Sequence, residues 1–161
     1  GDTLTSDPAL TFDPIPHFPP ECFGLLRTQD ISKHKQFQKG LKQLEEEGVM
    51  QIFYSPDHVR REPVLAAVGE LQFDVVMSRL ENEYGVKTSV ERLPHALARW
   101  IVGDPATISA VYWPSDTIRL VDQQGRGVML FTTEHLLAYC IKSNPSIKFL
   151  LREEVEQTSA Q

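Results

Sequence analysis

Apolar residues recur at helical spacing between positions 69 and 86. Five of them fall at positions i, i+3, i+4, i+7 and i+11 along one stripe: Phe73, Val76, Met77, Leu80 and Tyr84. At about 100° per residue these side chains share one face of a helix. Gly85 follows the last apolar turn, and a glycine there ends a helix at low conformational cost. The pattern therefore predicts one complete amphipathic helix.

Strand patterns lie on both sides of this helix. Residues 63–68 form a short apolar run before it, and residues 86–91 alternate with β-branched side chains after it. Upstream, a further helix is predicted to start at Asp30 or Ser32, either of which can cap it, and to end near Glu47 before Gly48. Its apolar stripe is Phe37, Leu41 and Leu44.

Strands are also predicted at residues 22–27 and 50–54. The order from residue 22 to residue 92 is then β-α-β-β-α-β, which is typical of the ferredoxin-like α+β sandwich, with two helices on one face of a four-stranded antiparallel sheet.

The second part of the chain has a similar pattern. Three strands and a capped helix are followed by another capped helix and a last strand. The predicted strands are 97–102, 117–121, 127–131 and 147–151, and the predicted caps are Asp104 and Thr133. This part therefore also has the order β-α-β-β-α-β.

Four segments are expected from this pattern. Residues 1–21 are rich in proline and are predicted to be an extended lead-in. Residues 22–93 are the ferredoxin-like subdomain, and residues 94–152, which start at Pro94, are a second, similar subdomain. Residues 153–161 are expected to be a frayed acidic tail. The chain begins at Gly1 without an initiator methionine, which indicates either a processed product or a fragment cut from a longer protein.

Composition narrows the class of protein. The chain has 161 residues, of which 41% are hydrophobic, and this is enough to build a core. No apolar run approaches about 18 residues, so no membrane span is expected. The two cysteines, Cys22 and Cys140, lack metal-site spacing and are expected to be reduced thiols of a cytoplasmic protein.

The net charge of −6 is the wrong sign for a domain that wraps duplex nucleic acid, so any RNA contact must come from a local patch. On the first helix, Lys35, Lys39 and Lys42 lie opposite the apolar stripe, and Lys33 precedes them. These ammonium groups suit phosphate oxygens of RNA, although an ordinary solvent-facing surface has the same pattern. Arg60 and Arg61 form a second candidate in a polar loop.

Catalytic chemistry has little support in the sequence. No phosphate-binding Gly-x-x-x-x-Gly-Lys-Ser/Thr loop and no Gly-x-Ser-x-Gly nucleophile turn is present. The five histidines are scattered without a His-x-x-x-His pair, so no metal site is expected. Glu45, Glu46 and Glu47 are interpreted as a solvated run. Trp100 lies in an apolar strand and is predicted to be a core residue.

Several motifs resemble one family of translation factors. The segment Gly69-Glu70-Leu71-Gln72-Phe73 and the later Glu83-Tyr84-Gly85-Val86 are similar to a helix of ribosome-bound translational GTPases, and the Leu-Gln-Phe variant resembles bacterial peptide chain release factor 3. Further segments match that family in order: Ile15-Pro16-His17-Phe18-Pro19-Pro20-Glu21, Lys35-Gln36-Phe37-Gln38-Lys39-Gly40-Leu41, Glu46-Glu47-Gly48 and Ala98-Arg99-Trp100.

The resemblance implies a cytoplasmic protein with a GTPase domain, a β-barrel domain and a C-terminal domain that this chain represents. It also implies that residues 1–21 are the lead-in from that preceding β-barrel domain. In that family, GTP and magnesium bind to the GTPase domain, and GTP hydrolysis on the ribosome is linked to removal of the class I release factor. The nucleotide-binding motifs are missing here, so no catalytic, cofactor or metal residue carries over, and the expected partners are the ribosome and the class I release factor.

Two other interpretations remain open at this stage. One is a self-standing ferredoxin-like RNA-binding module, although the central strand 64–68 lacks the aromatic residues that such modules use. The other is a small enzyme on the same sandwich, such as an acyl phosphate hydrolase, or a small-molecule regulatory module. Only fold analogy supports these two functions.

Overall fold

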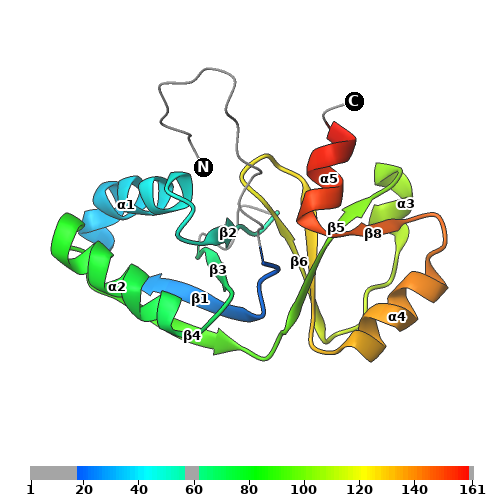
Figure 1. Cartoon of the computed structure of the whole chain (residues 1–161), viewed down its shortest axis with the longest axis horizontal. Helices are drawn as coiled ribbons and strands as arrows, with labels where there is room; N and C mark the ends of the chain where they lie inside the picture. Colours follow the sequence, from blue (N-terminus) through cyan, green and yellow to red (C-terminus); the bar gives the residue numbers. More distant parts are fainter. Residues whose placement is uncertain (1–17, 57–61, 160–161) are drawn as a thin grey trace, which may run out of the picture.

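The first half of the molecule is a four-stranded antiparallel sheet with two helices on one face. The computed structural model describes residues 18–56 and 62–159 (Figure 1). The elements of the first half are β1 (Cys22–Thr28), the 3-10 helix η1 (Ile31–Lys33), α1 (His34–Glu46), β2 (Gln51–Phe53), β3 (Val64–Ala67), α2 (Leu71–Tyr84) and β4 (Thr88–Leu93). The strand order β2-β3-β1-β4 confirms the predicted ferredoxin-like sandwich.

The second half repeats this arrangement. Its elements are β5 (Leu97–Val102), α3 (Pro105–Ala110), β6 (Thr117–Val121), β7 (Gly127–Phe131), α4 (Glu134–Ser143), β8 (Lys148–Leu150) and α5 (Arg152–Ser159). The strand order β6-β7-β5-β8 is equivalent to that of the first half, and all its neighbouring strands are antiparallel.

The first helix begins in two steps. The Asp30 carboxylate accepts a hydrogen bond from the Ser32 backbone N–H at 2.9 Å, so that of the two predicted caps Asp30 starts the helical segment. The first turn is the 3-10 helix η1, and α1 follows from His34. At the end of α2, Gly85 has a φ of 67°, as predicted for a helix that ends on a left-handed residue.

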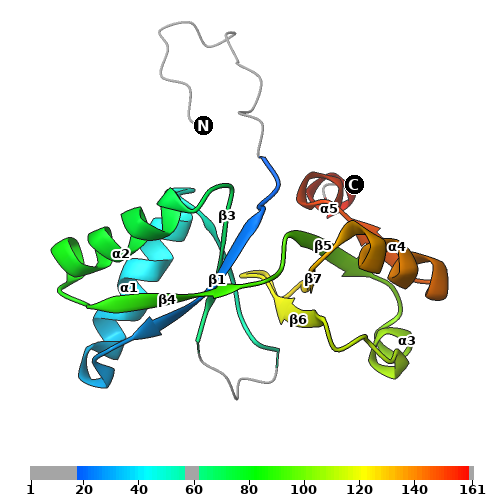
Figure 2. The ribbon, with the colours of Figure 1, turned by 90° about the horizontal axis from the view of Figure 1, so that it is seen from below.

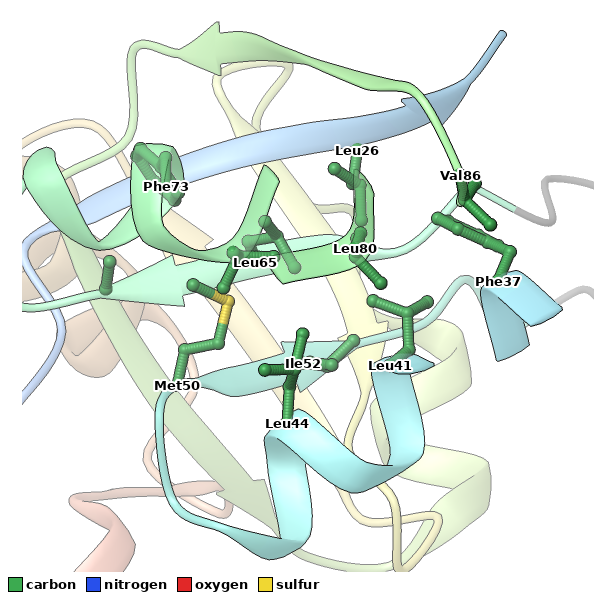
Figure 3. Packing of buried hydrophobic residues seen from close by; sticks show 12 residues of the cluster. Leu26, Phe37, Leu41, Leu44, Met50, Ile52, Leu65, Phe73, Leu80 and Val86 are labelled. Atoms are coloured by element: carbon green, nitrogen blue, oxygen red, sulfur yellow. The ribbon is translucent and has the colours of Figure 1, made fainter. Parts of the chain in front are cut away.

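Side chains from α1, α2 and the adjacent sheet face form the core of the first half (Figure 3). The helices approach closely at Gly40, where an added Cβ atom would lie only 2.7 Å from Leu80 Cδ2. The cluster contains twelve buried residues: Leu26, Phe37, Leu41, Leu44, Met50, Ile52, Leu65, Ala67, Phe73, Val76, Leu80 and Val86. Met77 and Tyr84, the other members of the predicted stripe, are only partly buried.

The two sheets face each other across a further core, which we call the inter-sheet cluster. Helices α1 and α2 lie on one outer side of the molecule, and α3 and α4 lie on the other (Figure 2). The buried members are Phe23, Phe53, Val64, Ala66, Ala98, Trp100, Leu120, Val128, Leu130 and Val155. Trp100 is 2% exposed and meets Phe53 edge to face, with ring centroids 5.7 Å apart, which confirms its predicted core role.

The halves also meet through their strand edges. Tyr54, next to β2, and Val121 of β6 exchange two backbone hydrogen bonds of 2.8 Å each. β2 and β6 are edge strands of their own sheets. This bridge links the two sheets at one margin, while Pro94 and the following residues connect β4 to β5.

The acidic C-terminal segment was predicted to be a frayed tail, but it forms a helix. Residues Arg152–Ser159 form helix α5, which lies beside β5 (Figure 1). Val155 is 5% exposed and belongs to the inter-sheet cluster. One apolar residue on a polar helix is a weak signal in sequence, but here it anchors the helix.

Among the helices that the structure describes, none is both long enough and apolar enough to cross a lipid bilayer.

Candidate nucleic-acid interface

The basic stripe, defined as Lys35, Lys39 and Lys42, lies on the outer face of α1. All three side chains are exposed. The buried residues Phe37 and Leu41 are on the opposite side of the helix and pack against the sheet (Figure 3). The amphipathic pattern of α1 therefore orients the stripe away from the core, as its spacing predicts.

The charges of the basic stripe differ in how they are compensated. Lys42 Nζ lies 3.6 Å from Glu46 Oε1 one turn along the helix. Lys35 and Lys39 form no ion pair with any residue in the described ranges. These two cations are therefore the ones with charge to offer an anionic partner, and Lys35, in the first turn of α1, also lies near the positive end of the helix dipole.

Lys33 was predicted to contact RNA together with the basic stripe, but its side chain forms a hydrogen bond within the protein. Its ammonium group donates a hydrogen bond of 2.6 Å to the backbone oxygen of Gly85, which ends α2. Lys33 thus ties the start of the first helical segment to the end of the second helix. Arg60 and Arg61, the other predicted contacts, lie outside the described residues.

The sheet face that ferredoxin-like RNA-binding modules use for bases is not free here. In such modules, aromatic side chains on the face opposite the helices stack on bases. In this molecule, Phe23 and Phe53 on that face are each 1% exposed because the second sheet covers them. Base stacking on this face of the sheet is therefore blocked, and an RNA contact must use the outside of the molecule.

One glutamate of the Glu45–Glu47 run was wrongly expected to be solvated. Glu46 and Glu47 are exposed, and Glu47 pairs with Arg79 of α2. Glu45 is partly buried between the halves, and this burial raises the pKa of its carboxyl to about 7. The available signal is its helical position, beside Leu41 and Leu44 at the edge of the apolar stripe.

Glu45 lines a cavity of about 240 Å³, which we call the junction cavity. The first half contributes Glu45 and Gln51, and the second half contributes Asp122, Arg126 and Arg152. Sequence patterns do not identify such a site because its walls come from segments far apart in the chain.

No cluster typical of a metal centre occurs in the described ranges, in the sense of three or more His, Cys, Asp or Glu side chains placed to share one ion. His95 is buried, and this burial lowers its pKa. It lies at the connection between β4 and β5, and the charged residue acting on it there is Asp116.

Comparison with known proteins gives one consistent result. Residues 12–141 match the family model described as class II release factor RF3, C-terminal domain. Over 148 residues the chain is 47% identical to peptide chain release factor 3 of Cyanothece sp. (strain PCC 7425 / ATCC 29141), a match that covers 92% of this chain and 27% of that protein.

Two further relatives agree. Peptide chain release factor 3 of Gloeobacter violaceus is 46% identical over 150 residues, and that of Symbiobacterium thermophilum is 41% identical over 149 residues. Each match covers 92% of this chain and 28% of the relative, so the chain spans little more than a quarter of these proteins. By this match, the chain belongs to the family of class II release factor RF3 C-terminal domains.

Proposed function

We propose that this chain is the ribosome-interacting part of a peptide chain release factor 3 that acts in the cytoplasm during translation termination. The family match, which covers most of the chain, carries this proposal. Within the complete factor, the domain contacts the ribosome while the GTPase domain changes conformation. The complete factor then promotes departure of the class I release factor.

GTP hydrolysis is assigned to the remainder of the factor. The 161 residues contain no phosphate-binding loop. GTP and magnesium are therefore expected to bind to the GTPase domain, and the role of this part is binding and positioning rather than catalysis.

The basic stripe is the contact that we propose for ribosomal RNA. Its three lysines are exposed on one side of one rigid helix and span about 10 Å along the helix axis. Lysine is a compact, mobile cation that suits phosphate oxygens without reading sequence. A stripe of this kind positions the domain on the ribosome, while the net charge of −6 disfavours non-specific binding elsewhere on RNA.

Charge reversal tests the stripe in the full-length factor. Lys35→Glu, Lys39→Glu and Lys42→Glu together should weaken ribosome binding, measured by co-sedimentation over a range of salt concentrations. Because fewer counterions are released on binding, the dependence of affinity on salt should also become shallower.

A matched control carries Lys87→Glu, Lys142→Glu and Lys148→Glu, which reverse three exposed lysines outside α1. The control should retain most of the affinity although its net charge is the same. Equal losses in the two variants would exclude a specific role for the stripe, and unchanged binding of the α1 variant at every salt concentration would exclude any role.

A stand-alone RNA-binding module is the alternative function. The burial of Phe23 and Phe53 between the sheets disfavours it, because bases stack on that face of the sheet in such modules. Because this face is covered, the isolated chain should bind single-stranded RNA weakly and without base preference, which filter binding can measure.

A further inference from the structure

The junction cavity contains two arginines from the second half of the molecule. It lies where β2, the turn between β6 and β7, and the start of α5 come together (Figure 1). Arg126 belongs to that turn, and Arg152 is the first residue of α5. Both arginines line the cavity, which has a volume of about 240 Å³. Two forked guanidinium groups therefore border one small space.

Each of these guanidinium groups has unused N–H donors. Arg126 Nε donates to Asp122 Oδ2 at 2.6 Å, and Arg152 Nε donates to Glu156 Oε1 at 2.7 Å. The terminal Nη atoms of both arginines form no hydrogen bond with any residue in the described ranges, and they are not sealed inside the protein. The side chain of Arg126 is only 24% exposed. Donors that are largely covered but still accessible favour an acceptor that enters the cavity.

The two acidic residues of the described cavity wall leave these donors free. Asp122 Oδ2 accepts hydrogen bonds from Arg126 and Trp100, and Oδ1 accepts from the backbone N–H groups of Gln124 and Arg126. Glu45 Oε2 is sealed from solvent. Burial also raises the pKa of the Glu45 carboxyl to about 7. Below that pH, the wall holds two guanidinium charges against the one carboxylate of Asp122.

The opening of the cavity is partly apolar. Phe18 and Val68 line it and are 67% and 45% exposed. Because exposed residues of a cavity wall lie at its opening, these two side chains border the entrance to the arginines. Apolar surroundings with a few polar groups that set the orientation are typical of binding sites, and exposed apolar side chains that lie together mark surfaces where other proteins bind.

We propose that the junction cavity binds the carboxylate side chain of an aspartate or glutamate presented by a partner protein. Guanidinium groups donate paired hydrogen bonds to carboxylates, and the free Nη atoms of Arg126 and Arg152 supply such donors. One negative charge matches the one guanidinium charge that Asp122 leaves unbalanced in the wall. The cavity is smaller than a typical pocket for a drug-sized ligand and suits a single side chain.

The apolar opening favours a protein over RNA as the source of the anion. A phosphodiester of RNA also carries a single negative charge, but its neighbours are sugars and further phosphates. Apolar side chains next to an acidic residue of a protein would instead cover Phe18 and Val68. The inference concerns a different surface from the basic stripe, and it does not depend on contact with RNA.

The probe for this site is the capped peptide acetyl-leucyl-glutamyl-leucinamide, added to the 161-residue chain at pH 6. At this pH the glutamyl side chain, with an ordinary pKa of about 4.3, is ionised, and Glu45 is mostly protonated. The glutaminyl peptide is the matched control because it has nearly the same shape and no charge. Binding is followed by the side-chain nitrogen-15 signals of Arg126 and Arg152. The glutamyl peptide should give saturable shifts there, and the glutaminyl peptide should bind at least about tenfold more weakly.

Variants separate this site from general attraction between charges. Arg152→Gln should weaken binding of the glutamyl peptide about tenfold, because one charged, forked donor is lost. Arg119→Gln makes the same change of charge at an exposed position of β6 outside the cavity and should leave binding unchanged. Arg126 is kept in both variants because it neutralises the largely buried Asp122. Far-ultraviolet circular dichroism establishes that each variant is folded before its affinity is compared.

A phosphodiester probe separates the two sources of an anion. Dimethyl phosphate, which has the charge of an RNA backbone phosphate, should bind more weakly than the glutamyl peptide because it leaves the apolar opening uncovered. Binding of dimethyl phosphate at the same arginine signals with equal or higher affinity would identify a phosphate site and contradict the proposal.

Three further results would overturn the proposal. The first is no saturable shift at Arg126 and Arg152 with the glutamyl peptide, as expected if water alone satisfies the Nη donors. The second is equal binding of the glutamyl and glutaminyl peptides. The third is an equal effect of Arg152→Gln and Arg119→Gln in folded protein. None of these results bears on the ribosome binding proposed for the basic stripe, so the two proposals can fail separately.

Discussion

The two halves share one strand order but stabilise their helices differently. In the first half, α1 and α2 have 13 and 14 residues and pack against each other at Gly40. In the second half, α3 and α4 have only 6 and 10 residues. Asp104 and Thr133 cap these shorter helices through their side chains. The N-cap residues of α1 and α2, Lys33 and Glu70, make no such hydrogen bond, and the side-chain cap at Asp30 belongs to the 3-10 turn before α1.

This difference shows that helices in the same topology can be stabilised mainly by local interactions or mainly by long-range packing. Isolated short helices gain little from backbone hydrogen bonds alone, so side-chain caps contribute more of their stability. Long helices that pack on one another depend instead on close steric fit. Between these outer layers, the inter-sheet cluster belongs to both halves and should make them unfold together.

The largest effect is expected at the shared core. Trp100→Ala should lower the free energy of unfolding by about 3–5 kcal/mol, because a large buried ring and its hydrogen bond to Asp122 are lost. Urea unfolding followed by amide signals from each half should show both halves lost at the same lowered midpoint. A first half that keeps its original midpoint would show that the halves are independent.

A smaller effect is expected where the long helices meet. Gly40→Ala places a methyl group 2.7 Å from Leu80 Cδ2 and 3.0 Å from the Tyr84 ring. Overpacking of this kind costs about 1–3 kcal/mol. Gly69→Ala is the matched control, since an added Cβ atom there meets nothing within 4 Å. Thermal unfolding should separate the two variants. A similar melting temperature for both would mean that the helix pair is loosely packed.

The junction between the halves should respond to pH. Burial raises the pKa of Glu45 from 4.5 to about 7, so between these values the folded state holds a proton that the unfolded state releases. Stability therefore falls as the pH rises through this window, by about 1 kcal/mol once partial exposure is considered. Glu45→Gln should flatten this part of the profile in urea unfolding at pH 5 and pH 8. An unchanged profile would place the carboxyl in open solvent.

The smallest effect is expected at a cap of the second half. Thr133→Ala removes the hydroxyl that accepts a hydrogen bond of 3.2 Å from the Leu136 N–H. The expected cost is about 1 kcal/mol, measured by thermal unfolding. Thr132→Ala, one residue earlier, is the control. If the two substitutions lower the stability equally, side-chain capping does not contribute more to the helices of the second half.

Local pattern was sufficient to predict the strands, the helices α1 to α4 and the orientation of the basic stripe. The spacing of Phe73, Val76 and Leu80 placed their side chains on one helix face, and all three are fully buried. The helix α5 was missed because Val155 is its one large apolar residue and the remainder is polar. Periodicity alone does not show that a single side chain is enough to anchor a helix.

Contacts between distant segments could not be predicted in the same way. Lys33 and Gly85, which are 52 positions apart, meet only after both helices pack on the sheet. The inter-sheet cluster had a partial signal, because all four residues of Val64–Ala67 are apolar and buried. A continuous apolar strand is typical of a sheet covered on both faces, but it does not identify the covering element.

The bridge between Tyr54 and Val121 has a further consequence, for self-association. Strand edges with unpaired backbone groups are templates on which other chains can add and aggregate. Here two edge strands, β2 and β6, are brought together within one molecule, and the bridge occupies part of both edges. A chain whose halves come apart would expose both edges at once. The paired edges thus protect the protein against aggregation for as long as the halves remain together.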